Sequence, residues 1–588
     1  MRSGKKLTLG ILPTFLCLLS MLVVACGGGG GGTSSNQVTK AADNKQIFID
    51  PYHVRGTTEV KTLDPALVQD EGSTAVVDAL FTGLMTLDNN LALQGELAQS
   101  YSVASDGVTW TFKLKPNLTF SDGTPLTSQD VIYSINRSLQ KSTNSPVAGS
   151  YLNLVKDSDK ALAGKMSTLI GDSLLAPDPS TVRIITNQKA AYFLYTMTYS
   201  DAFVVEKKLV DQYGAKFTDH LADSANTGGG SGPFILKKYT RGQEVDLVPN
   251  THYYGAKPQL KELVFAFYQS QDTIYKAYQT NTVSYSGVPV AQLASAKQLT
   301  SEFHAVPQLA EYYYAMNYLV KPFDNIKVRQ AFALALNKDE IAHAVHKDTV
   351  VATNHIVPKG VVGYYPDLKG PDGTTSTAGN PTMAKQLLAE GLKEEGLSTM
   401  PAVTATVYSS GSTAARNEFA AEQQMWQTVL GVNVKIQDED FNKAITDQLN
   451  AANNPNGISF WYSGWITDYP DAQDWLTLQF DKGSPNNEMN YGQNKSANSA
   501  EQQANQKLME QADANTTNPS QRAQQYNTAE QQLVNDAAWV PIDQDTLQLV
   551  RRPCVVGYPE NGEGLVDPQS WSNVYISTDP NCTNATVH

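Results

Sequence analysis

Segments with the hydrophobic pattern of β-strands alternate with segments that have the pattern of α-helices along most of the chain. Apolar and polar residues alternate over residues 108–115, as they do in a strand that buries one face. Residues 126–139 carry apolar side chains at helical spacing, and Thr127 or Ser128 can cap the first turn. Helices are also predicted over residues 328–345 and, as a pair divided near Asn518 and Pro519, over residues 498–538. Because strands and helices that alternate in sequence usually build a sheet with helices packed on it, the pattern predicts an α/β fold.

The chain is long enough for several domains, and it is acidic. About 540 of its 588 residues follow position 45, which corresponds to three or four domains of ordinary size. Three of the 44 basic residues and none of the 58 acidic residues lie in residues 1–25, so the remainder has a formal net charge of −17. Such a surface disfavours nucleic acid as a partner, because nucleic-acid binding needs cationic groups.

The N-terminus has the pattern of a secretory signal peptide. Residues 7–25 are mostly apolar and uncharged, and three basic residues precede them. The segment ends in VVAC at residues 23–26, which resembles a bacterial lipobox. We therefore expect that residues 1–25 are removed and that Cys26 is lipidated; an ordinary signal peptide with an incidental cysteine is the alternative. Six glycines follow Cys26, so residues 26–45 are expected to form a Gly/Ser-rich tether to the cell membrane.

Two further cysteines, Cys554 and Cys582, lie near the C-terminus. Outside the cytoplasm their thiols can be oxidised. We expect one structural disulfide between them, and two free thiols are the alternative. Their spacing matches no zinc-binding motif.

No motif in the sequence indicates catalysis or a bound cofactor. A phosphate-binding GxxxxGK[ST] loop and a GxSxG nucleophile elbow are both absent from the sequence. His343 and His346 have a helical spacing that metals can use, but only Glu340 is close to them in sequence, so we expect ordinary histidines. Acidic residues are close together between positions 468 and 474, as is also common in capped loops. We therefore expect neither an enzyme nor a cofactor or metal.

Five motifs occur in order along the chain and resemble those of one receptor family. They are TLDP at 62–65 with LFTGL at 80–84, TWTFKL at 109–114 with FSDGTPLT at 120–127, SGPF at 231–234, YYY at 312–314 with PFDN at 322–325 and VRQA at 328–331, and GWITDYPD at 464–471. The family is the dipeptide/oligopeptide-binding family of ABC-importer receptors, family 5 of the bacterial extracellular solute-binding proteins. Most of these motifs are interpreted as structural, and Asp324 and Arg329 are expected to form a packing pair.

The resemblance implies a periplasmic-binding-protein type II-like, two-lobed fold with an extra domain that enlarges one lobe. Two lobes joined by hinge strands would close over a ligand. Carried onto this chain, domain I consists of residues 46–72, 188–305 and 535–588, domain II of residues 73–187, and domain III of residues 306–534. A monomer is expected.

The resemblance also implies a ligand site. In peptide-binding members, the acid at the position of Asp468 pairs with the α-ammonium group of the ligand, and nearby backbone adds a strand to the peptide. The expected site residues besides Asp468 are Gly464, Trp465, Ile466, Tyr462, Gln69, Asp70 and Glu71. Tyr462 stands where some relatives have a basic residue, and Ala310 and Ile466 stand where some relatives have a disulfide. A ligand other than a peptide therefore remains an alternative. Asp468 could instead be a loop carboxylate that caps residues 471–473.

The implied function is an extracytoplasmic receptor that captures a dipeptide or oligopeptide in a closed cleft. Its further partners would be the permease subunits of an ABC importer and, through the lipid anchor, the membrane. One alternative is an oligosaccharide receptor of the same family, in which Trp461, Trp465 and Trp475 stack on sugar rings. Another is a receptor that senses peptides without transporting them.

Overall fold

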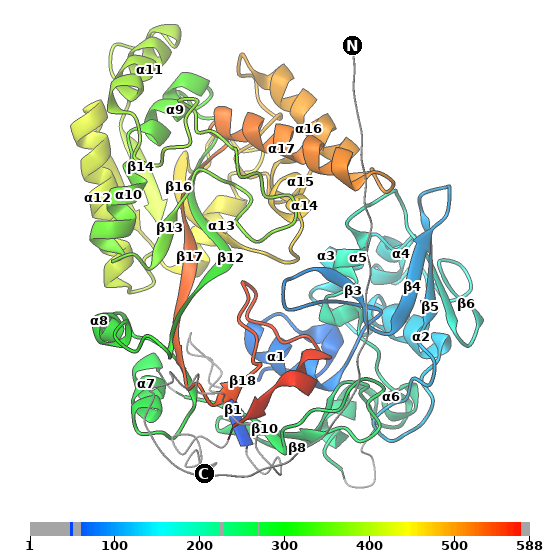
Figure 1. Ribbon diagram of the computed structural model, residues 1–588. Helices are drawn as coiled ribbons and strands as arrows, with labels where there is room; N and C mark the ends of the chain where they lie inside the picture. The colour runs from blue at the N-terminus through cyan, green and yellow to red at the C-terminus, as the bar shows by residue number, and fades with distance from the viewer. Residues whose placement is uncertain (1–46, 51–59, 224–227, 269, 578–588) are drawn as a thin grey trace, which may run out of the picture. The chain divides into compact units, whose positions relative to one another are not determined.

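The structure is a computed structural model of the chain, and it describes residues 47–50, 60–223, 228–268 and 270–577. The expected signal peptide, Cys26, the whole of the tether and Cys582 lie outside the described residues. Among the described residues, no helix is both long and apolar enough to span a membrane. Helices and strands are mixed throughout, as the alternating sequence pattern predicts (Figure 1).

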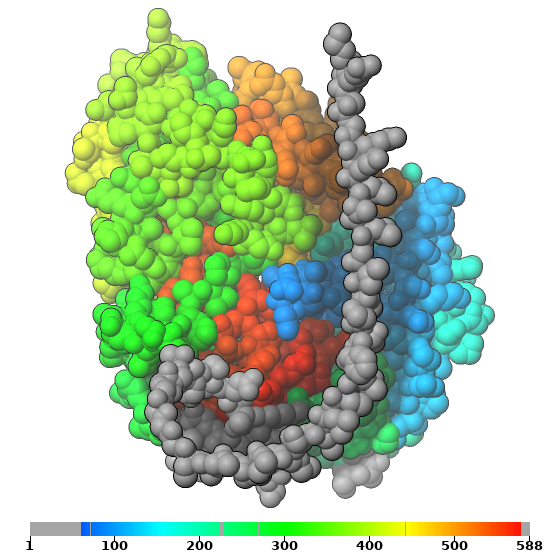
Figure 2. Space-filling model, in the orientation of Figure 1, coloured from blue at the N-terminus to red at the C-terminus, as the bar shows by residue number. Residues whose placement is uncertain are grey.

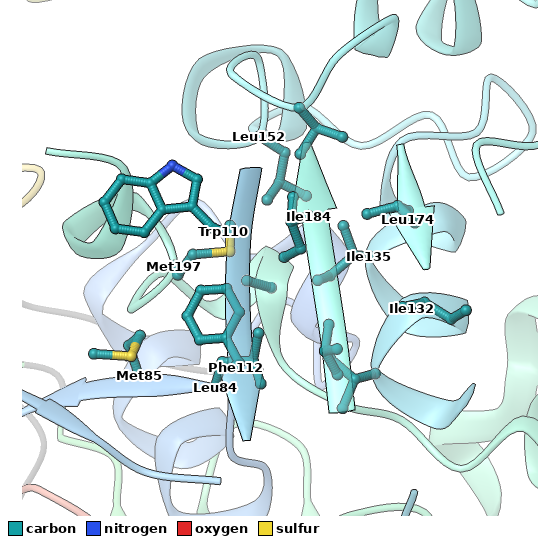
Figure 3. Packing of buried hydrophobic residues seen from close by; sticks show 14 of the residues in the cluster. Leu84, Met85, Trp110, Phe112, Ile132, Ile135, Leu152, Leu174, Ile184 and Met197 are labelled. Carbon is teal, nitrogen blue, oxygen red and sulfur yellow. The ribbon is translucent and has the colours of Figure 1, made fainter. Parts of the chain in front are cut away.

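A four-stranded antiparallel sheet carries the TWTFKL motif. Its order is β4 (Ala98–Val103), β5 (Thr109–Leu114), β7 (Thr181–Ile185) and β6 (Leu174–Asp178). On β5, Trp110, Phe112 and Leu114 are buried while the residues between them are less so, which confirms the predicted half-buried strand. Figure 3 shows Trp110 and Phe112 beside Ile184 of β7, within the same hydrophobic cluster. Short elements of this part are β2 (Met85–Leu87), β3 (Leu93–Gly95), α3 (Ala148–Tyr151), α4 (Ser158–Leu162) and α5 (Phe193–Thr196).

Helix α2 (Ser128–Ser138) contributes Ile132 and Ile135 to the same core (Figure 3). Its N-terminus is capped at Thr127, whose backbone N–H donates to the Asp130 carboxylate at 2.8 Å. The Asp130 carboxylate thereby gives a partner to a backbone N–H at the start of the helix that would otherwise have none. The helix therefore begins one residue later than the FSDGTPLT motif ends.

A second four-stranded sheet has the order β1 (Ile47–Asp50), β10 (Glu262–Ala266), β9 (Glu244–Pro249) and β8 (Phe234–Thr240). The SGPF motif leads into β8 and packs against α1 (Glu71–Leu80): the backbone N–H of Gly232 donates to the carbonyl of Leu80 at 2.9 Å. A Cβ on Gly230 would lie 2.1 Å from that carbonyl oxygen, so the close approach requires glycine. Neighbouring elements are η1 (Pro65–Leu67), η2 (Ser200–Ala202), α6 (Lys207–Tyr213), η3 (Gly214–His220), α7 (Gln271–Gln279), η4 (Val290–Gln292), α8 (Leu293–Ala296), β18 (Val555–Val556), η6 (Ser570–Asn573) and β19 (Tyr575–Ile576).

The largest sheet has seven strands. Its order is β11 (Tyr285–Gly287), β17 (Trp539–Arg551), β12 (Phe303–Met316), β16 (Phe460–Ile466), β14 (Val403–Val407) and β15 (Val434–Asp438), and β13 (Val350–Ala352) also pairs with β17. The long strands β12 and β17 run between two cores: Val540 of β17 belongs to one hydrophobic cluster together with Val403 of β14, and Leu549 of β17 belongs to another together with Phe234 of β8.

Helices pack around this sheet (Figure 1). The predicted pair in residues 498–538 is confirmed as α16 (Ser499–Asp513) and α17 (Pro519–Asn535). The predicted helix over residues 328–345 is instead split into α9 (Ile326–Leu334), α10 (Lys338–Glu340) and the π-helix η5 (Ile341–Val345). The remaining helices are α11 (Pro381–Glu394), α12 (Thr413–Leu430), α13 (Phe441–Leu449), α14 (Ala472–Trp475) and α15 (Thr477–Phe480).

Arg329 of the VRQA motif is structural, and it forms a buried ion pair. Its guanidinium is fully buried and pairs with Asp536 at 2.8 Å. It also donates to the backbone carbonyl oxygens of Phe323 and Asp324, whereas the Asp324 carboxylate lies 3.6 Å from Lys321. Arg329 and Asp324 therefore do pack together, through the backbone of Asp324, and the ionic partner of Arg329 is Asp536.

Candidate functional site

A cavity of about 370 Å³ lies where segments from several parts of the chain meet. In Figure 2 the red C-terminal segment lies at the surface beside the blue N-terminal quarter, and both supply cavity residues. The volume falls within the range of ordinary small-ligand pockets. The lining residues lie between positions 69 and 96, 198 and 203, 308 and 310, 466 and 468, and 547 and 571, together with Phe265 and Tyr285.

The cavity wall contains four of the residues expected at the site: Gln69, Asp70, Ile466 and Asp468. Glu71 begins α1 next to them, and its side chain is outside the described part of the structure. Ala310, which is paired directly opposite Ile466 across β12 and β16, also lines the cavity. Segments about 400 residues apart in sequence therefore meet around one space.

Gly464, Trp465 and Tyr462 do not line the cavity, in contrast to the expectation. The Tyr462 ring is buried in the core, where it meets Phe419 edge-on at 4.9 Å. Gly464 is paired with Tyr312 of β12, and the Trp465 indole N–H donates to Asp474. Burial decreases along β16 toward its C-terminal end, so only the last residue of the strand and the loop after it reach the cavity.

Asp468 lies in the loop that follows β16, and it is half-buried. Its backbone N–H donates to Asp474 Oδ2 at 3.2 Å, which fixes the loop. Burial raises the pKa of the Asp468 carboxyl to about 6, and a hydrogen bond from the Tyr151 hydroxyl acts in the opposite direction. Tyr151 in turn stacks on Tyr199, another cavity residue, with ring centroids 3.7 Å apart.

The residues after Asp468 are held by other groups. Asp471 caps α14 by accepting from the backbone N–H of Gln473 at 2.9 Å, and it pairs with Arg522 through two contacts of 2.6 and 2.7 Å. The capping role that sequence alone left open for Asp468 is thus performed by Asp471. The Asp468 carboxylate remains at the cavity wall.

The cavity wall is strongly acidic, a feature that the motifs did not indicate. Among the described residues, no lysine, arginine or histidine lines the cavity. Seven carboxylic acids do: Asp70, Asp78, Asp88, Glu96, Asp468, Glu563 and Asp567. A ligand with negative charge would therefore meet repulsion, and a ligand with positive charge would meet a favourable field.

Some of these acids accept hydrogen bonds from neighbouring backbone, and others are available to pair with a ligand. Asp70 caps α1 at Ser73, and Asp88 accepts from the backbone N–H of Asn90, so both support the fold. Burial raises the pKa of Asp78 to about 7. Burial, with the charge of Asp78 as a further cause, raises the pKa of Glu563 to about 8.

Asp567 belongs to the same group. Burial raises its pKa to about 6, and the charge of Glu96 contributes. Glu96 itself accepts from Gln569 at 2.7 Å and from the Tyr253 hydroxyl at 3.2 Å. Asp78, Glu563, Asp567 and Asp468 are therefore the acids best able to meet a cation in the cavity.

The profile of one protein family, the bacterial extracellular solute-binding proteins of family 5, matches residues 92–487. The chain belongs to this family. Its curated relatives include the oligopeptide-binding protein OppA of Bacillus subtilis strain 168, which is 26% identical over 82% of this chain and 86% of its own length. The periplasmic oligopeptide-binding protein OppA of Escherichia coli K12 is also 26% identical, over 88% of this chain and 91% of its own length.

The solved structures agree with this assignment at the level of the fold. The periplasmic murein tripeptide-binding protein MppA, in its unliganded open form, superposes with a TM-score of 0.75. It is 23% identical, and the match covers 92% of this chain and 99% of that structure. The fold is therefore the α/β, two-lobed fold of the periplasmic binding proteins, as the resemblance implies. The family consists of solute-binding proteins.

Proposed function

We propose that this protein is an extracytoplasmic receptor that captures peptides in its acidic cavity and delivers them to an ABC importer. The observation that carries the proposal is the position of Asp468 at the cavity wall, at the end of the GWITDYPD motif. The names of the relatives, which are oligopeptide- and dipeptide-binding proteins, support it.

Asp468 fits the amino terminus of a peptide in charge and position. A ligand ammonium that leaves water needs a fixed anionic partner, because an unpaired buried charge is very unfavourable. The loop around Asp468 is held by Asp474, and the Asp471–Arg522 pair holds the residues that follow, so the carboxylate is fixed before the ligand arrives. Ile466 lies in the same wall, and its backbone would pair with the peptide backbone.

The other acids of the cavity would favour positive charge on the rest of the peptide as well as at its amino terminus. Asp78, Glu563 and Asp567 line the cavity without a lysine, arginine or histidine beside them in its described wall. We propose that the preferred peptides also carry basic side chains and that acidic side chains are disfavoured. Like charges brought together in a partly desolvated site cost binding free energy, and opposite charges gain it.

An oligosaccharide is less well supported as the ligand. Trp461 and Trp475 are completely buried, and Trp465 does not line the cavity. None of these three indoles can therefore stack on a sugar ring in the cavity. Trp571 does line it, but it is almost fully buried and packs edge-on against Phe234.

The remaining parts of the proposal concern domains, motion and anchoring. We propose the domain ranges given above, with β12 and β17 as the connections between lobes and closure of the lobes over the peptide. Cys26 would carry a lipid anchor, and the receptor would act as a monomer. Cys554 is buried and disulfide-bonded, and Cys582 is the partner that we propose.

The experiment that tests the proposed function is a ligand-identification measurement followed by calorimetry. Native mass spectrometry of the chain purified without denaturation should show a co-purified peptide. Calorimetry should then show binding of trialanine or trilysine and no binding of maltotriose. Binding of maltotriose in preference to both peptides would overturn the proposal, and binding without uptake by cells that hold the importer would favour a sensing receptor.

A further inference from the structure

Outside the peptide cavity, three potential metal ligands gather from distant parts of the chain. His346, Glu418 and Asp543 each offer one ligand atom, and these atoms all lie within 4.8 Å of one another. None of the three lines the peptide cavity. A function for this cluster would therefore be separate from the capture of the ligand.

Each of the three residues is placed by a local feature of its element. His346 directly follows the π-helix η5, and π-helical turns are rare and frequent at functional sites. Glu418 lies on the buried face of α12, four residues before Glu422. Asp543 lies on β17 at a register shift, where Tyr312 pairs with Asp543 but Tyr313 pairs with Pro541. Such an irregularity can re-aim a side chain relative to a regular ladder.

The carboxylates of this cluster are buried and have few partners. The exposed fractions of Glu418 and Asp543 are both 2%, and Glu422 is fully buried. Glu418 Oε2 lies 3.1 Å from His346 Nε2, while Glu418 Oε1 has no hydrogen-bond partner among the described residues. Glu422 accepts from the Tyr314 hydroxyl through Oε2, and its Oε1 also has no described partner.

The charged groups around the cluster do not neutralise it. Lys338 interacts electrostatically with Asp543, but its ammonium donates to the Thr353 carbonyl and to Asn354 at 2.8 and 2.7 Å. Asp545 and Glu311 are further acids near Asp543. His346, which contacts Glu418, can supply at most one positive charge against the carboxylates of Glu418, Glu422 and Asp543. Buried carboxylates in such excess are very unfavourable unless they are protonated or bind a cation.

We propose that His346, Glu418 and Asp543 bind a divalent transition-metal ion, with Zn²⁺ as the best fit. One imidazole nitrogen and two carboxylate oxygens are a suitable ligand set for zinc, with water in a fourth position. Ligands about 2.0–2.1 Å from zinc at tetrahedral angles are about 3.4 Å apart, and the Nε2–Oε2 distance of 3.1 Å is close to that. The ion would tie η5, α12 and β17 together and so stabilise this part of the fold.

The competing explanation is that the buried carboxylates share protons and hold no metal. The two explanations differ in what metal addition does. If the cluster binds zinc, added ZnCl₂ should raise the melting temperature of the metal-free chain by several degrees, because a ligand that binds only the folded state stabilises it. If the carboxylates are simply protonated, the cluster contributes nothing to a zinc response.

The experiment is zinc titration of the purified metal-free chain by calorimetry, with elemental analysis after dialysis. We expect one equivalent of zinc per chain. His346→Gln and Glu418→Gln should each weaken binding at least about tenfold, since each removes a ligand. The matched control is His343→Gln: this histidine lies three residues before His346, its side chain is 80% exposed and it pairs with Asp348, so its replacement should leave zinc binding unchanged.

Two results would overturn the proposal. One is that the wild-type chain retains no stoichiometric zinc and shows no rise in melting temperature. The other is that His343→Gln weakens binding as much as His346→Gln does, which would assign the zinc to surface histidines. If Glu418→Gln does not fold, Asp543→Asn replaces it, and circular dichroism of the metal-free variants verifies folding before each titration.

Discussion

The hydroxyl of Tyr151 hydrogen-bonds to the carboxylate of Asp468, although the two residues are more than 300 positions apart in sequence. Tyr151 belongs to the core around β5 and α2, while Asp468 follows the strand β16. The bond favours the ionised carboxylate at the wall of the cavity. The state of Asp468, and with it the recognition of a peptide ammonium, therefore depends on a residue of helix α3, which belongs to another hydrophobic core.

Asp468→Asn should weaken the binding of a peptide with a free amino terminus by at least about tenfold. Removing one member of a buried ion pair costs roughly 3–5 kcal/mol, and tenfold in affinity is only about 1.4 kcal/mol. N-acetylation of the peptide should have a similar effect. The two changes together should cost much less than their sum, because each removes the same interaction. Calorimetry on the four combinations measures this, and undiminished binding of the acetylated peptide would contradict the assignment.

Peptide binding should weaken as the pH falls below about 6. The free Asp468 carboxyl has a pKa of about 6, and only its ionised form attracts an ammonium group. Below that pKa a proton competes with the peptide, so Kd should rise by up to about tenfold per pH unit. Above about pH 8 the peptide amine loses its proton, and binding should weaken again.

Tyr151→Phe provides a control for this pH dependence. Without the Tyr151 hydroxyl, the ionised form of Asp468 loses a hydrogen bond, so its pKa should rise and the acidic limb of the profile should move to higher pH. Calorimetry between pH 4.5 and 9 would show this shift. An acidic limb that is the same in wild type, Tyr151→Phe and Asp468→Asn would exclude Asp468 as the titrating group.

The charge of the peptide side chain should affect its affinity. Among the tripeptides Ala-Lys-Ala, Ala-Ala-Ala and Ala-Glu-Ala, we expect the lysine peptide to bind most tightly and the glutamate peptide at least about tenfold less tightly than it. Asp567→Asn should reduce this difference, because the Asp567 carboxyl lines the cavity and, with a pKa of about 6, is ionised at neutral pH. Glu560→Gln is the matched control, since Glu560 lies on the same loop but pairs with Arg551 and does not line the cavity. Equal affinities for all three peptides would refute the charge preference while leaving peptide binding intact.

Cys26→Ala should release the protein from membranes. The VVAC sequence at residues 23–26 and the glycines after it predict that Cys26 is acylated after removal of residues 1–25. Intact-mass measurement should show loss of the acyl mass, and fractionation should show the variant in the soluble fraction. Acyl chains contribute about 0.8 kcal/mol per buried CH₂, so their loss should be decisive. An unchanged membrane fraction would contradict lipid anchoring through Cys26.

The elements with strong periodicity could be predicted from sequence, and the elements shaped by distant contacts could not. TWTFKL on β5 and the helices α16 and α17 follow their hydrophobic patterns. The break between α9 and α10 has another origin: Asn337 caps α10 through the backbone N–H of Glu340, and the backbone N–H of Lys338 donates to Thr377. These contacts are not visible in the local helical pattern.

The candidate site shows the same division. Asp468 could be found because it lies in a motif, whereas Asp78 and Glu563 lie in no recognised motif and meet only in the folded chain. The motif also led us to expect Tyr462, Gly464 and Trp465 at the site, but β16 emerges from the core only at Ile466. A motif fixes the order of residues along a strand, but the depth of the strand in the core decides which side chains a ligand can touch.

Replacement of Arg329 should destabilise the protein without a direct effect on peptide recognition. Arg329 and Asp536 are both fully buried, and Arg329 also donates to the Asp536 carbonyl at 3.0 Å. Arg329→Met would leave the Asp536 carboxylate buried without its cation, which should lower the free energy of unfolding by roughly 3–5 kcal/mol. Neither residue lines the cavity, so the folded variant should keep the wild-type affinity for trialanine.

The second substitution Asp536→Leu tests the cause of this loss. If the uncompensated charge destabilises Arg329→Met, removal of that charge should restore a large part of the lost stability, because apolar residues can replace a buried ion pair at little cost. Urea unfolding of the wild type, both single variants and the double variant measures the coupling. If the double variant is less stable than Arg329→Met, the hydrogen bonds of Asp536 to its other neighbours, including Asn498, matter more than its charge. The VRQA motif would then stabilise this region mainly through hydrogen bonds rather than through the ion pair.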